Sequence, residues 1–251
     1  MKICVVSDVH YKYHSTNEAD LRVQKRFLSF LDFAIGRYDL LVLCGDIFDL
    51  YNEYKHVIIR EYFGIYHRLA KIKEAGCRIV FLSGNHDFWF GSFLTDELGV
   101  ELYPDNFTLR ADGKTIIFTH GDLYTVNDLR YHLLRKFLRL PITRTLVNLI
   151  HPDWALVLGA GLSRSSRERP APTSLQKQRA RGLKAWAKKN ILQGKADIVV
   201  MGHSHEAEIL PIGEGFYANA GEWIKRPSYL EITDGNITLK QYKTNNKENE
   251  Q

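Results

Sequence analysis

The chain begins MKICVVSDVH (residues 1–10), a short apolar run that ends in an aspartate and a histidine. A β-branched, nearly all-apolar run of this length predicts a strand that is covered on both faces of its sheet. The same order, an apolar run followed at once by polar residues, recurs further along the chain. The strands predicted in this way are Ile3–Ser7, Leu40–Cys44, Arg78–Leu82, Thr115–Thr119 and Asp197–Met201.

Amphipathic helical patterns lie between several of these strands. One covers Leu21–Ile35 and another covers His56–Glu74, which Gly76 follows as a helix stop signal. Alternating strands and helices predict an α/β layered fold. After Met201 the apolar runs are shorter and joined by turns, which predicts a second, more antiparallel sheet. Its expected strands are Glu208–Pro211, Gly215–Ala218, Ser228–Thr233 and Ile237–Tyr242.

Each of the first five strands is followed by side chains that are common metal ligands. Open α/β sheets place their sites at the carboxyl ends of strands, so we expect these side chains to converge. Carboxylate, amide and imidazole donors suit two divalent ions, with Mn²⁺ expected and Fe²⁺ or Zn²⁺ as alternatives, which together would contact one phosphoryl group. The predicted division is Asp8, His10 and His205 on one ion, Asn85, His120 and His203 on the other, and Asp46 bridging them.

The same segments resemble the signature of the calcineurin-like metallophosphoesterases. The matching motifs are Asp8-Val9-His10, Gly45-Asp46-Ile47-Phe48-Asp49, Gly84-Asn85-His86-Asp87, His120-Gly121-Asp122 and Gly202-His203-Ser204-His205. The resemblance covers about residues 1–240. It implies a four-layer α-β-β-α sandwich with a helical lid insertion. It also implies a hydrolase in which two catalytic residues accompany the metal ligands, His86 near the leaving group and Asp87 holding His86.

The stretch from about residue 123 to 190 interrupts the alternation and carries no strand pattern. It combines leucines, Phe137 and Trp154 with arginines, and a basic helical pattern over Leu175–Leu192 follows. We therefore expect a helical insertion or lid at 123–190 and a core of 1–122 and 191–242. The polar segment 243–251 is expected to be a disordered tail.

Charge is distributed unevenly along the chain. The segment Arg130–Asn190 holds 14 Lys and Arg against two acidic residues, a net charge of +12, whereas the whole chain is at +5. The remainder is therefore at −7. A local excess of this size indicates a polyanion or an anionic membrane surface as a partner.

Composition excludes several classes of protein. Hydrophobic residues make up 45% of the chain, an ordinary globular share, and no apolar stretch is long enough to predict a membrane span. The first residues lack the features of a signal peptide, so we expect residence in the cytoplasm. Cys4, Cys44 and Cys77 lie in or beside apolar runs and are expected to be reduced cysteines of the core.

The insertion resembles the lid of the UDP-2,3-diacylglucosamine pyrophosphatases of lipid A synthesis. The resemblance rests on Asn127-Asp128, Tyr131, Arg135, Arg139-Leu140-Pro141, 151–155 and 163–167, together with 45–49 and 88–91. It implies hydrolysis of an acylated nucleotide sugar to UMP and 2,3-diacylglucosamine 1-phosphate (lipid X), by an enzyme peripherally associated with the inner membrane. The implied substrate contacts are Asn85, His86, Asp128, Ser163, Arg167 and His203.

Alternatives remain at this point. Many pyrophosphatases of this type have Arg where this chain has His86, which leaves open another phosphomonoesterase or phosphodiesterase acting on a lipid or nucleotide. A non-catalytic scaffold of the same fold would normally lack metal ligands, and none of the expected ligands is missing here. Nucleic acid as a partner is disfavoured, because aromatic residues in the basic segment are few and no nucleic-acid motif is present. The oligomeric state is left open.

Overall fold

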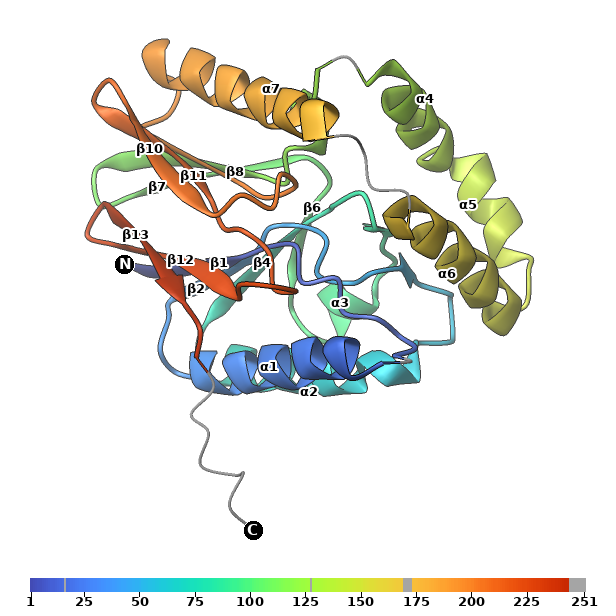
Figure 1. Cartoon of the computed structure of the whole chain (residues 1–251). Helices are drawn as coiled ribbons and strands as arrows, with labels where there is room; N and C mark the ends of the chain where they lie inside the picture. Colours follow the sequence, from blue (N-terminus) through green and yellow to red (C-terminus); the bar gives the residue numbers. More distant parts are fainter. Residues whose placement is uncertain (16, 127, 169–172, 244–251) are drawn as a thin grey trace.

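Two stacked β-sheets form the centre of the molecule (Figure 1). The computed structural model describes residues 1–15, 17–126, 128–168 and 173–243. The first sheet has the strand order β13-β12-β1-β2-β4-β6, in which β1, β2, β4 and β6 are parallel and β12 and β13 are antiparallel. Its strands are β1 (Lys2–Val6), β2 (Leu40–Leu43), β4 (Arg78–Leu82), β6 (Glu101–Tyr103), β12 (Ser228–Thr233) and β13 (Asn236–Gln241).

The second sheet has the strand order β10-β11-β9-β8-β7. Its three central strands β11, β9 and β8 are parallel, and each edge strand is antiparallel to its neighbour. The bounds are β7 (Asn106–Ala111), β8 (Lys114–Thr119), β9 (Ile198–Met201), β10 (Glu208–Ile212) and β11 (Gly215–Asn219).

Helices cover the outer face of each sheet, which gives four layers (Figure 1). Alternate residues of a strand point to opposite faces, so Cys4 and Val6 of β1 pack toward α1 (Glu18–Ala34) and α2 (Phe63–Glu74). Ile3 and Val5 pack instead into the core between the two sheets. The all-apolar strands therefore have the double burial that their composition predicts.

The fourth layer is α7 (Thr173–Leu192). Leu183, Ala187 and Ile191, one helical turn apart, are buried against Val199 and Tyr217 on the outer face of the second sheet. The α/β four-layer sandwich expected from the sequence is confirmed. The three cysteines are free and buried, as expected.

The composition of the second sheet differs from the expectation. The four strands after Met201 were expected to form it, but only β10 and β11 belong to it, whereas β12 and β13 extend the first sheet beside β1. Two strands from earlier in the chain, β8 and β9, form the centre of the second sheet. The sequence pattern identified these strands but not their partners, because alternation of polar and apolar residues reports burial and not pairing.

Several short elements were not expected. Strand β7 alternates between exposed and covered residues at the edge of the second sheet, and β6 lies at the edge of the first. The others are β3 (Tyr51–Asn52), β5 (Asp87–Trp89), α3 (Phe93–Asp96) and the 3₁₀ turns Arg60–Tyr62 and Asp122–Tyr124. All of these except β7, which has six residues, span two to four residues and offer too few positions for a periodic pattern.

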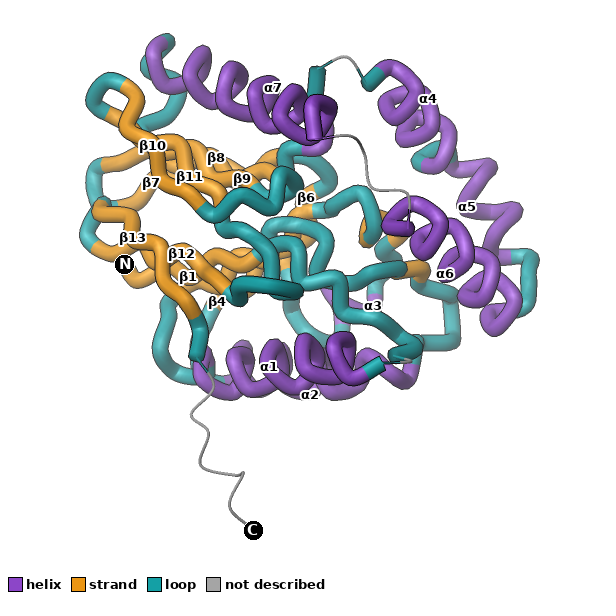
Figure 2. Tube along the Cα trace, viewed as in Figure 1, coloured by secondary structure: helices purple, strands orange, loops and turns teal. Residues whose placement is uncertain are grey.

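Three helices precede α7 in the stretch that lacks strands: α4 (Leu129–Leu138), α5 (Pro141–Asn148) and α6 (Pro152–Glu168). They lie on the side of the molecule opposite the labelled N-terminus, beyond the loops that follow the carboxyl ends of the central strands (Figure 2). The expected core boundary at residue 190 falls inside α7, and the division into core and lid stays a prediction. Residues 244–251 of the expected tail lie outside the described residues.

None of the helices in the described part of the chain is both long and apolar enough to cross a membrane.

Candidate metal centre

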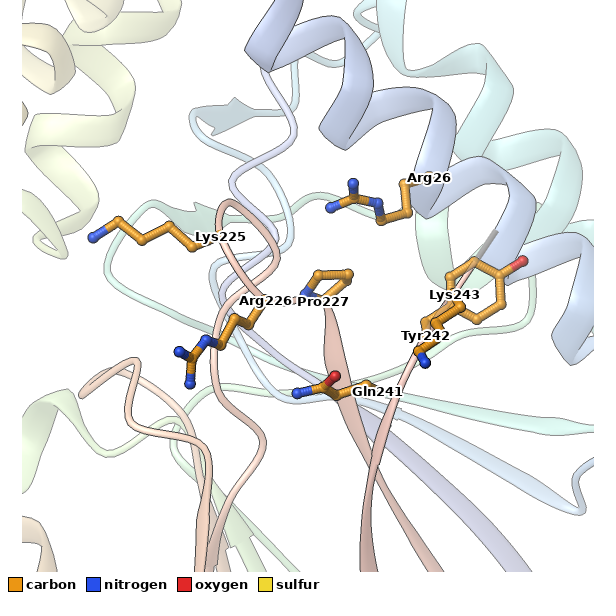
Figure 3. Close-up of a pocket in the computed structure, with 7 residues that line it drawn as sticks. All are labelled: Arg26, Lys225, Arg226, Pro227, Gln241, Tyr242 and Lys243. Atoms are coloured by element: carbon orange, nitrogen blue, oxygen red, sulfur yellow. The ribbon is translucent and has the colours of Figure 1, made fainter. Parts of the chain in front are cut away.

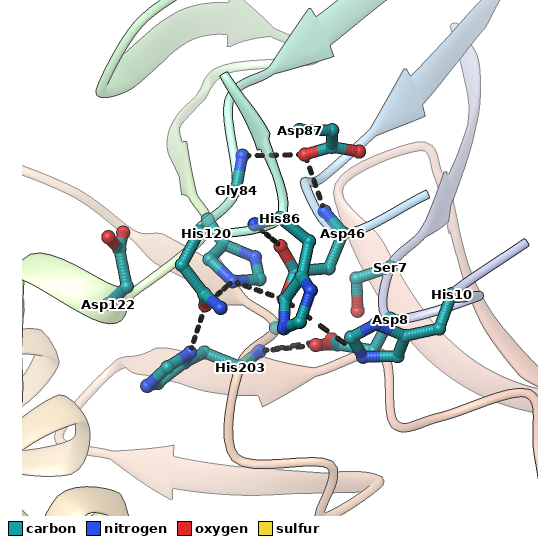
Figure 4. A network of polar contacts seen from close by, with 12 residues as sticks. Ser7, Asp8, His10, Asp46, Gly84, His86, Asp87, His120, Asp122 and His203 are labelled. Atoms are coloured by element: carbon teal, nitrogen blue, oxygen red, sulfur yellow. Dashed lines mark hydrogen bonds and ion pairs between the residues drawn. The ribbon is translucent and has the colours of Figure 1, made fainter. Parts of the chain in front are cut away.

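The first group of predicted ligands comes from loops after β1 and β9. Nε2 of His205 lies 3.2 Å from Oδ1 of Asp8 and 3.5 Å from Nε2 of His10 (Figure 4 shows the surrounding network). Asp8 is fully buried and His205 is partly exposed, so the group opens toward solvent on one side. The donors Asp8, His10 and His205 lie close enough together to hold one ion.

The second group comes from loops after β4, β8 and β9. Oδ1 of Asn85 lies 3.2 Å from Nε2 of His120 and 3.0 Å from Nδ1 of His203. Asp46, from the loop after β2, lies between the two groups: its Oδ2 is 3.4 Å from Nε2 of His120 and 4.0 Å from Nε2 of His10. The structure thus brings all seven predicted ligands into two adjoining clusters.

These separations fit metal coordination. Two donors that each lie about 2.1 Å from one ion, at angles of about 90–110°, are about 3.0–3.4 Å apart. The distances from Asn85 to His120 and His203, and from Asp8 to His205, fall in that range. Imidazole, carboxylate and amide donors without a thiolate suit borderline or hard divalent cations.

Five of the seven residues have left-handed backbone conformations. The φ angles are 53° at Asp8, 50° at His10, 54° at Asp46, 64° at His203 and 62° at His205. Such angles are uncommon for residues with a Cβ and cost about 1–3 kcal/mol each where the surroundings impose them. Their concentration at one place indicates that the loops are bent to aim these side chains inward.

Two glycines make room for the clusters. Gly45 has φ 82°, and a Cβ at this position would lie 2.5 Å from Nδ1 of His120. A Cβ on Gly84 would overlap the carboxylate of Asp46. Glycine is therefore required at both positions by the close approach of a predicted ligand.

A second layer of polar groups orients the ligand side chains. Nδ1 of His120 lies 3.0 Å from the carbonyl oxygen of Cys44, so this nitrogen donates and Nε2 is directed at Asp46 and Asn85. Nδ1 of His205 lies 3.4 Å from Oε2 of Glu222. Contacts of this kind fix the tautomer and the ring angle of metal-binding histidines. Glu222 was not predicted, because the residue lies in a loop without a motif.

The structure differs from the expectation that Asp87 holds His86. The buried Asp87 carboxylate accepts hydrogen bonds from the backbone N–H groups of Gly84, Asp46, Ile47 and Phe48, at 2.7–3.1 Å (Figure 4 shows two of these contacts). Asp87 therefore fixes the loops that carry Asp46 and Asn85. The ring of His86 is held by another residue, since its Nδ1 lies 3.0 Å from the carbonyl oxygen of Asp49.

The electrostatics of the clusters favour an added positive charge. Burial opposes ionisation of Asp46, yet the neighbouring histidines hold the pKa of this carboxyl well below its usual range. Burial also favours neutral histidines, but Asp46 raises the pKa of His120 to about 10 and Asp8 raises that of His205 to about 10. Each cluster thus stabilises a cation, which a divalent metal ion would supply in place of the protons.

The pKa values of the other two predicted histidine ligands, His10 and His203, are lowered. Burial and the nearby His86 lower the pKa of His10 to about 3, and burial together with His120 lowers that of His203 to about 4. Both rings are therefore neutral at physiological pH, the form that coordinates a metal ion.

Asp122 links the metal centre to α4. Its carboxylate oxygen Oδ2 accepts a hydrogen bond of 2.6 Å from the hydroxyl of Tyr131 and another of 2.6 Å from Nε of Arg135. At the C-terminal end of α4, Arg139 makes a second contact with the metal-centre loops: it donates to the carbonyl oxygen of Gly84 at 2.9 Å. The motif that contains Asp122 was found in the sequence, but its partners on α4 could not be, because no local pattern pairs them.

The remaining predicted substrate contacts lie just before α4 and in α6. Asp128 is half-buried at the residue before α4. Ser163 and Arg167 belong to α6, and their side chains lie outside the described part of the structure. Of the six predicted contacts, Asn85, His86 and His203 are at the metal centre, and the assignment of the other three stays a prediction.

The site contains two buried carboxylates among histidines, and these side chains lie at the carboxyl ends of strands. In a four-layer sandwich, this arrangement defines a metal-dependent phosphoesterase site. The family model described as calcineurin-like phosphoesterase matches residues 1–207, and the chain belongs to this family.

Individual relatives give a narrower comparison. The chain is 32% identical over 168 residues to the UDP-2,3-diacylglucosamine hydrolase of Porphyromonas gingivalis, a match that covers 66% of this chain and 63% of that protein. It is 30% identical over 254 residues to the UDP-2,3-diacylglucosamine hydrolase of Blochmanniella pennsylvanica, with 94% of each chain covered. The chain thus matches less than two thirds of the first protein and nearly all of the second.

Among solved structures, a novel archaeal phosphodiesterase has the same fold. It superposes with a TM-score of 0.51 at 14% identity, covering 96% of this chain and all of that one. At this level of identity the likeness concerns the fold alone.

Proposed function

We propose that this protein hydrolyses the pyrophosphate bond of UDP-2,3-diacylglucosamine, releasing UMP and 2,3-diacylglucosamine 1-phosphate. The observation that carries the proposal is the Asp122–Arg135 contact, because it attaches an apolar and basic helix directly to a phosphoesterase centre. The UDP-2,3-diacylglucosamine hydrolases named above, which match 66% and 94% of this chain, support the substrate.

We assign the metal ligands as predicted: Asp8, His10 and His205 for one divalent cation, Asn85, His120 and His203 for the other, and Asp46 between them. Mn²⁺ is the proposed ion. Bound there, the two cations would supply Lewis-acid polarisation of the phosphoryl oxygens. The protein's own contribution is to hold the donors in place through Asp87, Cys44 and Glu222.

His86 is the proposed proton donor to the leaving group. Its Nδ1 donates to the Asp49 carbonyl, so Nε2 is left free to face the substrate and carries a proton to donate when the ring is in its imidazolium form. The ring of His86 meets that of His10 edge-on, with 4.8 Å between the centroids, so it lies beside the first cluster. A histidine so positioned can donate a proton as a general acid.

The helices α4 to α6 are proposed to form the lid over the acyl chains. Leu129, Leu133 and Phe137 recur at every fourth residue of α4 and are 71%, 59% and 59% exposed. Contiguous exposed apolar residues of this kind normally mark a surface that binds a ligand, a protein or a membrane. The acyl chains of the substrate are apolar, and Asp128, Ser163 and Arg167 are assigned to its polar groups.

The same helices are proposed to place the enzyme at the cytoplasmic face of the inner membrane as a peripheral protein. Trp154, Val157 and Leu158 of α6 are 58–71% exposed in a segment with a net positive charge. Exposed apolar residues within the segment 130–190, which has a net charge of +12, would bind an anionic lipid surface through both properties. Replacing Leu133 by Ser should reduce co-sedimentation with anionic vesicles, whereas Phe63→Ser on α2, at a residue that is 64% exposed, should not.

The test of the substrate is a comparison of two nucleotide sugars, the diacylated UDP-glucosamine and its deacylated form. Release of UMP, followed by ³¹P NMR, should be much faster for the acylated compound. Equal turnover of both would refute the assignment of the lid to acyl chains.

A second candidate is a phosphomonoesterase or phosphodiesterase with another lipid or nucleotide substrate. The observation that favours it is His86, where many pyrophosphatases of this type have arginine. Turnover of simple aryl phosphodiesters at rates above that of the acylated nucleotide sugar would support this alternative.

A further inference from the structure

A recess of about 310 Å³ lies between α1, the loop after β11 and the end of β13. The residues that line it carry four positive charges and no negative charge (Figure 3). They are Arg26, Lys225, Arg226, Pro227, Gln241, Tyr242 and Lys243. The recess is separate from the metal centre, and none of these residues belongs to the predicted site.

The four cations come from three separate parts of the chain. Arg26 projects from α1 above Pro227, and Arg226 and Gln241 lie on the other side of this proline (Figure 3). Bringing like charges together disfavours the folded state unless an anion is nearby. Within the described ranges, no acidic side chain forms an ion pair with any of the four.

Other cations of the same region do have acidic partners. One helical turn before Arg26, Arg22 lies 3.2 Å from Glu18, and on β13 the Lys240 ammonium lies 2.6 Å from Glu231. The lack of partners around the recess is therefore local and does not reflect a general shortage of acids on this face.

The recess has a rigid base. The backbone N–H of Tyr242 donates to the carbonyl oxygen of Pro227 at 2.9 Å, and its hydroxyl lies 2.8 Å from Oγ of Ser29. Its ring packs against Phe30, with 5.2 Å between the centroids. These contacts fix the strand end and the loop that carry three of the four cations, which lowers the entropic cost of binding an anion.

We propose that this recess is a binding site for a phosphate group, separate from the metal centre. Two arginines suit a phosphate because guanidinium groups donate pairs of parallel hydrogen bonds to its oxygens. The same chemistry is offered by a dissolved phosphate ester and by the head group of an anionic lipid. The proposal does not depend on the substrate assigned to the metal centre.

The test follows backbone amides of the full-length protein by NMR during titration with inorganic phosphate, with diamagnetic Zn²⁺ in place of Mn²⁺ at the metal centre. The amide chemical shifts of Lys225, Arg226 and Gln241 should change with phosphate concentration. They should saturate at a different concentration from those of the metal-centre loops. The double variant Arg26→Gln/Arg226→Gln should weaken this binding about fivefold, by loss of two ion pairs. Arg22→Gln is the matched control, because Arg22 already has an acidic partner.

A second titration uses phosphatidylcholine vesicles with and without phosphatidylglycerol. A response of the recess to phosphate alone identifies a dissolved ligand, and a response to the phosphatidylglycerol vesicles identifies a lipid head group. In either case, the double variant should bind the probe more weakly than Arg22→Gln does. No response of the recess amides to either probe, or an equal response in both variants, overturns the proposal.

Discussion

Asp122 and Arg135 form a nearly buried ion pair, with 2.6 Å between Oδ2 of the carboxylate and Nε of the guanidinium. Asp122 follows the loop of His120, and Arg135 lies in the middle of α4. The side chains are only 3% and 14% exposed. The position of α4 is thereby coupled to the loop that carries a predicted metal ligand.

Arg135→Gln should release α4 and leave the Asp122 carboxylate buried without its cation. Loss of one partner of a buried pair costs about 3–5 kcal/mol, and the residual exposure of Arg135 places the expected loss at the lower end. Urea unfolding should show this loss, and hydrolysis of the acylated nucleotide sugar should fall. Arg130→Gln, which removes an exposed cation five residues earlier in the same helix, is the control. Equal stability of both variants would contradict the coupling.

Asp46→Ala should abolish activity, because Asp46 lies between the two ligand clusters. Metal analysis of the purified variant should show less than the two ions expected of the parent protein. Glu231→Gln changes a carboxylate on β12 that is remote from the clusters, and this variant should retain both ions. Full metal content and activity in Asp46→Ala would exclude the bridging role.

His86→Ala should retain its metal ions and lower kcat by about 10²–10⁴-fold, the usual contribution of a positioned acid. His86→Arg should recover part of the loss, since arginine can still bind a phosphoryl oxygen. Steady-state kinetics with metal analysis distinguishes these outcomes. A fall in metal content that parallels the loss of activity would assign His86 to the ligands instead.

Metal binding should release protons. Against the opposing effect of burial, Asp46 and Asp8 raise the pKa values of His120 and His205 to about 10, so both rings are protonated at pH 8 in the metal-free protein. Coordination requires the neutral rings, and about two protons should leave when both clusters fill. Calorimetry in two buffers with different ionisation enthalpies measures this number, and the apparent affinity should fall as the pH is lowered. Release near zero would show that the rings do not coordinate.

Glu231 should contribute to stability at neutral pH and not in acid. Burial opposes its ionisation, but the hydrogen bonds from Lys240 and Tyr38 lower its pKa below 4.5. A folded-state pKa below the unfolded value stabilises the protein above the unfolded value, and the effect is lost as the pH falls through the folded value. Glu231→Gln should therefore cost at most about 1 kcal/mol at pH 7 and nothing near pH 3. Thermal unfolding at both pH values tests this difference, with Glu214→Gln in the exposed turn between β10 and β11 as control.

The sequence by itself determined the layered α/β class, most of the central strands and the residues at their ends. It could do so because burial on both faces demands an all-apolar run, and the chain must turn where that run ends. Asp8, Asp46 and His120 were therefore expected near one another before any pairing of strands was known.

Only the tertiary structure decided which strands pair and which residues orient the centre. Strands β12 and β13 joined the first sheet, Asp87 turned out to hold backbone amides, and Glu222 reached His205 from a loop without a motif. The cations around Pro227 likewise come together from three distant segments. Local patterns record burial and backbone preference, whereas contacts between distant segments depend on the packing of the whole chain, which no short stretch of sequence contains.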